Sequence, residues 1–171
     1  MGVLGTAKNR TYEPVADFFI ALSNVTGNLI SNLKLQKLVY YADAWHLANH
    51  GVSIIQEDFQ AWVHGPVIPA LYGEYKHFSW QPIERSDLDE KAYASIRNNL
   101  EQKTVMLLDA VADSYFGLSA YELEKMTHSE LPWRAARNGL ADDEPSDNVI
   151  SKEIMKDYYS SFIKKDGPQG S

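Results

Sequence analysis

Two histidines in one predicted helix have the spacing of metal ligands. His46 and His50 are four residues apart, and Asp43 lies three residues before His46. Positions i and i+4 share one face of a helix, which is how helical zinc sites bring two imidazoles together. No glutamate stands between these histidines, and a third ligand would have to come from far along the chain. We therefore expect a packing histidine at position 46 and a histidine near the helix C-terminus at position 50, where the helix dipole favours a cation.

Two further histidines lie where predicted elements end. His64 follows a predicted strand, and His128 stands beside Ser129 at a predicted helix end. A catalytic serine needs an activating base, an orienting group and oxyanion donors. Ser129 lies in neither a nucleophile elbow nor a Gly-rich oxyanion turn. We expect both histidines to bond backbone carbonyls and fix turns. We expect no catalytic residue, bound metal or cofactor; a hydrolase or metal enzyme built on these four histidines is the less favoured alternative.

The composition excludes several classes of protein. The chain has 171 residues, 16 Lys and Arg against 23 Asp and Glu, a formal charge of −7 and no cysteine. The lack of cysteine excludes disulfides and thiolate chemistry and is typical of a reducing compartment. The opening MGVLGTAKNR lacks the apolar core of a secretory signal, and no run approaches the roughly 20 apolar residues that span a bilayer. We expect a cytoplasmic protein without a membrane contact. An acidic chain with no basic cluster is also a poor candidate for nucleic-acid binding.

Aromatic side chains are concentrated in one part of the chain. Nine of the 20 lie between residues 40 and 80, which predicts the packing centre there. Some of them could stack on nucleobases, but Lys76 is the only basic residue between positions 55 and 85, so an anchor for a protein partner is favoured. The turn at residues 64–66 is rigid because proline restricts the backbone, and rigidity lowers the ordering cost of binding. The candidate partner-binding residues are therefore Trp62, His64, Pro66, Tyr72 and Tyr75.

A dense acidic patch lies in the second half of the chain. It consists of Asp142, Asp143, Glu144 and Asp147. A solvated turn is the simpler interpretation, although a local charge of −4 could also steer a basic partner toward the chain.

Helical periodicity accounts for most of the chain. The segment from Asn32 to about Asn49, stopped by Gly51, is apolar nearly all round, which predicts a central, buried helix. A long helical stretch after residue 87 is expected to break near Thr104. The predicted helices begin with capping residues or with a proline of the first turn: Thr11, Asn32, Pro69, Asp87, Ser119, Pro132 and Ser151.

The pattern changes between residues 57 and 85. Alternation of apolar and polar positions over 59–63 predicts a short strand, and residues 82–85 are its predicted partner. The fold class is thus mainly α (α+β): a compact bundle of about six to eight helices around a central apolar helix, with a small antiparallel β element near residues 57–63 and 82–85. We expect a single domain over residues 1–171, with its core at about 12–162 and frayed tails at 1–10 and 164–171.

Three strings of residues go further than these patterns. The first is LKLQKLVYYADAWHL (33–47), the second FQAWVHGPVIPALY (59–72), and the third runs from Ala120 to Arg137. Together they resemble the signature segments of the Panacea family, the SocA-like antitoxin domain, over about residues 12–162. The AWVHGPVIP string is the most specific of them. The residues that match these signatures and are expected to form the scaffold are Leu35, Lys37, Leu38, Tyr41, Trp45, Gly65, Pro69, His128, Pro132 and Trp133.

The resemblance implies an antitoxin that neutralises a co-encoded protein toxin by direct binding. It implies an alternative as well, an adaptor that delivers the toxin to a ClpXP-type protease. The family has no established catalytic residues, so none is assigned to this chain. The class of the toxin, the face that binds it and the oligomeric state do not follow from the resemblance.

Overall fold

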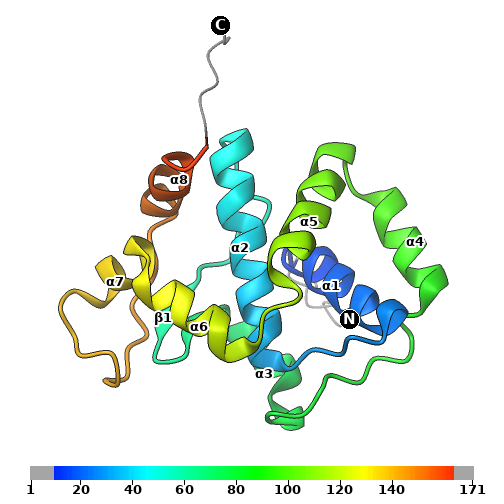
Figure 1. The fold of residues 1–171 in the computed structure, drawn as a ribbon, viewed down its shortest axis with the longest axis horizontal. Coiled ribbons are helices and arrows are strands. Elements are labelled where there is room, and N and C mark those ends of the chain that lie inside the picture. Colours follow the sequence, from blue (N-terminus) through cyan, green and yellow to red (C-terminus); the bar gives the residue numbers. More distant parts are fainter. Residues whose placement is uncertain (1–9, 164–171) are drawn as a thin grey trace, which may run out of the picture.

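Helix α2, Asn32–His50, runs through the centre of the molecule (Figure 1). In the computed structural model, which describes residues 10–163, fourteen of the nineteen residues of α2 are buried. A helix can be buried on every side only if other elements cover it all round, and this explains why its sequence has no polar face. The prediction of a central apolar helix is confirmed.

The other helices surround α2 or rest on its neighbours. They are α1 (Glu13–Thr26), α3 (Pro69–Tyr75), α4 (Glu90–Asn99), α5 (Gln102–Tyr115), α6 (Ala120–Ser129), α7 (Leu131–Arg137) and α8 (Lys152–Ser160), with a 3-10 turn at Lys76–Phe78 after α3. Helix α8 packs most extensively on α2, while α4 lies on α1. In Figure 1, α7 and α8 lie on one side of α2, and α1, α4 and α5 lie on the other. The predicted fold class, mainly α with a small β element, is confirmed.

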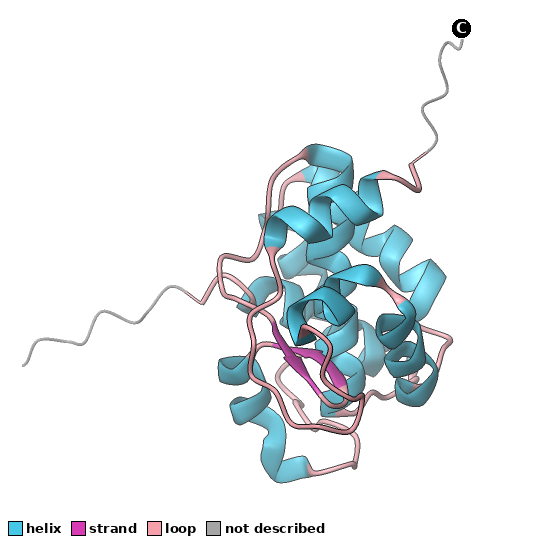
Figure 2. Ribbon diagram, turned by 90° about the vertical axis from the view of Figure 1, so that its left-hand side faces the viewer, coloured by secondary structure: helices cyan, strands magenta, loops and turns pink. Residues whose placement is uncertain are grey.

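The β element is a tight hairpin between the helices (Figure 2). Strand β1 (Gln60–Trp62) pairs antiparallel with β2 (Gly65–Val67), so that Trp62 lies opposite Gly65 and two residues connect the strands. The predicted partner strand at residues 82–85 is wrong. Gly65 adopts a φ of +104°, which allows the chain to turn within the two residues Val63 and His64. The segment that follows the turn, β2, therefore pairs with β1. Pro82 forms an isolated bridge with Ser31 instead.

The later helices begin largely as their capping signals predict. Ser119 forms a complete capping box with Glu122, and the Ser151 hydroxyl accepts from the Ile154 N–H at 3.1 Å. Helix α4 is capped by Asp89 and not by the predicted Asp87. The Asp87 carboxylate is instead paired with the Arg85 guanidinium at 2.7 Å, which removes it from the capping position.

The earlier helices differ from the prediction at their first residues. Ser31 caps α2, because the predicted cap Asn32 is buried and donates to the Tyr72 carbonyl at 3.0 Å. The Thr11 side chain bonds Glu57 and does not cap α1. The break in the long helical stretch falls at residues 100–101, where the backbone becomes extended, and Thr104 lies inside α5.

The described part of the chain, residues 10–163, holds no helix with the length and apolar character needed to cross a bilayer. The tails predicted at 1–10 and 164–171 lie outside the described residues, apart from Arg10.

Gly65 gives the fold its sharpest steric requirement. A Cβ at this position would lie 2.3 Å from Cε of the buried Lys37, in a backbone conformation that L side chains rarely adopt. We expect Gly65→Ala to lower the free energy of unfolding by about 2–6 kcal/mol, because positive φ and overpacking each cost about 1–3 kcal/mol. Denaturant unfolding measures this change.

The matched control for this substitution is Gly73→Ala in α3. No heavy atom lies within 4 Å of a Cβ built on Gly73, and its backbone is helical. Alanine there should leave stability unchanged or raise it by up to about 1 kcal/mol. Equal effects of the two substitutions would contradict the close packing of Lys37 under the hairpin.

Candidate functional site

The hairpin is held by side chains that donate hydrogen bonds to its backbone. Three residues of α6 and α7 bond three consecutive carbonyl oxygens: Arg137 that of Ala61 (2.9 Å), Trp133 that of Trp62 (2.8 Å) and His128 that of Val63 (2.8 Å). The ring of His128 also stacks on Trp133, with centroids 3.9 Å apart. These bonds give each of the three consecutive carbonyl oxygens a side-chain donor.

A lysine of α2 donates a hydrogen bond to the second strand of the hairpin. Lys37 is fully buried, and its Nζ donates to the Pro66 carbonyl at 3.3 Å. Burial lowers the pKa of Lys37 to about 7, against a smaller opposing effect of the Glu124 charge. The neighbouring Gln36 accepts from the Ile68 N–H at 3.1 Å, so α2 holds the end of the hairpin through two polar side chains.

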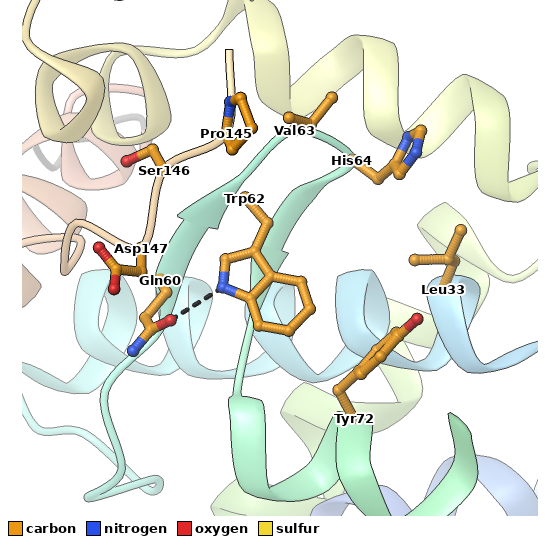
Figure 3. Close-up of a pocket in the computed structure, with 9 residues that line it drawn as sticks. All are labelled: Leu33, Gln60, Trp62, Val63, His64, Tyr72, Pro145, Ser146 and Asp147. Atoms are coloured by element: carbon orange, nitrogen blue, oxygen red, sulfur yellow. Dashed lines mark hydrogen bonds between the residues drawn. The ribbon is translucent and has the colours of Figure 1, made fainter. Parts of the chain in front are cut away.

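A pocket of about 640 Å³ opens beside the hairpin (Figure 3). Its walls come from β1 and the β-turn, from the start of α2, from α3 and from the loop before α8. The lining residues are Leu33, Gln60, Trp62, Val63, His64, Tyr72, Pro145, Ser146 and Asp147. The volume lies in the range of sites that take a small ligand or a few side chains of a partner.

Two aromatic rings form a corner in this pocket. The ring of Trp62 meets that of Tyr72 at 65°, with the centroids 5.1 Å apart. The indole N–H of Trp62 donates to the Gln60 side chain at 2.8 Å (Figure 3). Since the polar edge of the indole has a partner, its ring faces are the surface left for a visiting group.

The structure brings together three of the five residues predicted to bind a partner. Trp62, His64 and Tyr72 all line the pocket. His64 lies at its rim with 62% of the side chain exposed, and its Nδ1 is 3.0 Å from the Glu124 carboxylate. Pro66 and Tyr75 are buried and present no side-chain surface to a partner.

The loop that carries the acidic patch forms one wall of the pocket. The sequence did not predict that this loop would lie there. The isolated bridge between Gln60 and Val149 brings this loop to the edge of β1. Arg137 then holds it, because the guanidinium donates to the carbonyls of Ala141 and Glu144. The acidic residues were visible in the sequence, but no local pattern shows that a loop so far along the chain meets Trp62.

The remaining signature residues belong to the core or to its hydrogen-bond network. Leu35 and Leu38 are fully buried, and Pro69 and Pro132 lie in the first turns of α3 and α7. Tyr41 and Tyr159 both donate to the Glu130 carboxylate, at 2.9 and 2.7 Å. Burial raises the pKa of Glu130, although these bonds oppose the shift. The Tyr41 ring stacks on Tyr115, which accepts from the Trp45 indole at 2.7 Å.

The paired histidines of α2 have structural partners. His46 is buried and bonds the Val52 carbonyl at 2.8 Å, while its second ring nitrogen lies 3.3 Å from the Thr104 hydroxyl. His50 packs beside it near the helix end, with ring centroids 4.7 Å apart. Among residues 10–163 no group of three or more His, Asp and Glu side chains is placed to hold a metal ion.

Comparison with known proteins identifies the family of the chain. The family model described as "Antitoxin SocA-like, Panacea domain" matches residues 35–134. The chain belongs to this antitoxin family. The matched span of the Panacea domain includes most of α2, the whole hairpin, Lys37, His128 and Trp133, whereas Arg137 and the acidic loop lie beyond it.

One curated relative supports the same assignment. This Panacea-domain chain is 27% identical to Antitoxin SocA of Caulobacter vibrioides over 136 residues, which are 76% of this chain and 72% of the relative. No solved structure matches the chain significantly.

The buried Lys37 should give the stability of the domain a distinct pH dependence. In the unfolded chain this amine binds a proton up to about pH 10.5, whereas in the fold it loses the proton near pH 7. Between these values the unfolded state binds more protons, so the free energy of unfolding rises with pH, by about 1 kcal/mol per unit from this group. The stabilisation is lost as the pH falls toward 7.

The measurement is denaturant unfolding at several pH values between 7 and 9. Lys37→Met removes the titrating group, so its free energy of unfolding should rise less steeply with pH than that of the wild type. The exposed Lys76→Met is the control and should keep the wild-type slope. Identical slopes for the wild type and Lys37→Met would show that Lys37 stays protonated in the fold.

Proposed function

We propose that this antitoxin-family domain neutralises a cognate protein toxin, encoded beside it, by binding the toxin directly at the Trp62 pocket. The observation that supports the proposal most is a preformed apolar pocket on a hairpin that the signature residues hold in place. Trp and Tyr are also the residue types that most often dominate the energy of a protein interface.

The rigidity of the hairpin favours binding of this kind. Each of the three carbonyls from Ala61 to Val63 has a side-chain donor, so the loop is ordered before the toxin arrives. A surface that is already ordered loses less conformational entropy on binding, so a larger part of the contact energy contributes to affinity.

We propose that the domain acts without catalysis. His46 and His128 bond backbone carbonyls, which fixes turns and leaves these rings in structural positions. His64 and Ser146 lie at opposite ends of the pocket (Figure 3), and no hydrogen bond between them is present in the described structure. Direct occlusion of the toxin needs only the contact at the pocket, whereas delivery to a ClpXP-type protease needs a second contact, with the protease.

Trp62→Ala tests the site. The ring is only half-buried, so we expect the free energy of unfolding to fall by less than about 2 kcal/mol, below the roughly 3–5 kcal/mol of a fully buried tryptophan. We expect affinity for the co-expressed toxin to fall by at least about tenfold, as for a central aromatic anchor. Denaturant unfolding measures the change in stability, and titration calorimetry with the purified toxin measures the change in affinity. Growth rescue in co-expressing cells shows whether the weaker binding reduces neutralisation.

Trp80→Ala is the matched control, since Trp80 is 81% exposed and does not line the pocket. It should leave both stability and toxin binding unchanged. Loss of binding in Trp80→Ala with normal binding in Trp62→Ala would move the interface away from the pocket. If the wild-type chain neither rescues growth nor co-purifies with the neighbouring gene product, the proposed function itself is wrong.

A separate experiment distinguishes occlusion from delivery. We expect the half-life of the toxin to be equal or longer when the antitoxin is present, because a bound toxin is shielded. Pulse-chase labelling in cells with and without the ClpXP-type protease measures this half-life. Faster loss of the toxin, seen only when antitoxin and protease are both present, would favour the adaptor.

A further inference from the structure

The lining of the Trp62 pocket carries negative charge and no positive charge from Lys or Arg. Asp147 lies beyond Gln60, on the side of Trp62 away from Tyr72, and the other lining residues are aromatic, aliphatic or uncharged polar groups, with His64 at the rim (Figure 3). The His64 ring bonds Glu124, so a positive charge on this histidine would be balanced by its own partner. A visiting group in this pocket therefore meets aromatic rings, with a carboxylate on the side of Gln60.

The aromatic corner and the carboxylate together favour a cation. An indole is the best of the side-chain rings at attracting a cation to its face, and a phenol ring has the same property to a smaller degree. Trp62 and Tyr72 meet edge to face at 65°, and this contact fixes the orientation of both rings. A guanidinium fits this arrangement better than an ammonium, because it is planar, stacks on rings and is less strongly hydrated.

The carboxylate of the pocket has no cation of its own. Within residues 10–163 Asp147 forms no ion pair, and the same holds for Asp142, Asp143 and Glu144 of the same loop. All four are exposed. Arg137 binds the loop through main-chain carbonyls and stacks over Trp133 at 4.6 Å, so its charge is not paired with these carboxylates. The negative charges of this loop are therefore available to attract a positively charged group of a partner.

We propose that the pocket takes an arginine side chain from the toxin, with the guanidinium stacked on the Trp62 ring toward Gln60 and its charge attracted by Asp147 on that side of the pocket. This inference rests on the proposed function, because it names the chemistry of the partner at that same site. The toxin segment that enters the pocket carries an arginine flanked by apolar residues, which contact Leu33 and Pro145. The rest of the acidic loop speeds the encounter with a basic segment.

Short peptides test this chemistry without the toxin. The probe is acetyl-Ala-Leu-Arg-Leu-Ala-amide, and the matched peptides carry citrulline, lysine or norleucine in place of arginine. Citrulline keeps the shape of arginine and lacks its charge. Two-dimensional NMR of the nitrogen-15-labelled chain, with the Trp62 indole N–H signal assigned from Trp62→Phe, detects binding at millimolar peptide.

We expect the arginine peptide to shift the Trp62 indole signal and to bind at least about fivefold more tightly than the citrulline and norleucine peptides, which is about 1 kcal/mol, as expected of a cation on a ring face. The lysine peptide should lie between them. Equal binding of the norleucine peptide would show an apolar pocket and overturn the inference. So would the absence of any shift at Trp62 with the arginine peptide.

Asp147→Asn and Asp143→Asn form a matched pair of variants. Both remove one charge from the same loop, neither carboxylate bonds another described side chain, and only Asp147 lines the pocket. Asp147→Asn should reduce the preference for arginine over citrulline to less than about twofold, while Asp143→Asn should retain it. An equal loss in both variants would indicate a diffuse charge effect, and the assignment of Asp147 would then be wrong.

The same variants separate this inference from the proposed function. If the wild type forms the toxin complex and neither Asp147→Asn nor Trp62→Phe changes its affinity, the inference about arginine is wrong. Neutralisation by binding is then not contradicted. If no toxin complex forms with the wild type, the proposed function fails, whatever the peptides do.

Discussion

The hydrogen bonds from side chains to the carbonyls of the hairpin are the interaction on which the site depends. A two-stranded hairpin is barely stable in water by itself, and this one has only three residues in each strand. His128, Trp133 and Arg137 supply side-chain donors to carbonyls of β1 and the turn, and Lys37 supplies a fourth to a carbonyl of β2. The pocket exists because these bonds fix the strand that carries Trp62.

Two of the residues that donate hydrogen bonds to the hairpin are buried basic side chains. Lys37 and Arg137 are both almost fully buried, and neither forms an ion pair with a described carboxylate. Removing a charge from water costs several kcal/mol, which Lys37 avoids by losing its proton near neutral pH and Arg137 offsets with carbonyls and a stacked indole. Aliphatic residues would be cheaper to bury, but they would leave the hairpin carbonyls without partners. The polar contacts therefore specify where the hairpin lies.

Short-range signals in the sequence predicted more than long-range ones. The central helix, the caps at Ser119 and Ser151 and the grouping of Trp62, His64 and Tyr72 depend on residues close together in the chain, where periodicity and turn chemistry act. The pairing of β1 was mispredicted because a positive-φ glycine closes the hairpin within two residues, which favours the nearer partner. Asp147 could not be placed in the same pocket as Trp62, since the position of its loop depends on Arg137 and on a bridge to Gln60. Burial of Pro66 and Tyr75 likewise depends on what packs over them.

Arg137 binds the acidic loop only through its main chain, and this has an evolutionary consequence. The carbonyls of Ala141 and Glu144 would be present whatever side chains the loop carried. The contact with Arg137 therefore does not depend on which side chains the segment carries. Such an arrangement separates the part of a protein that must be kept from the part that can diversify. Substituting the loop while keeping Arg137 is accordingly a direct route to domains of the same fold with new partner preferences.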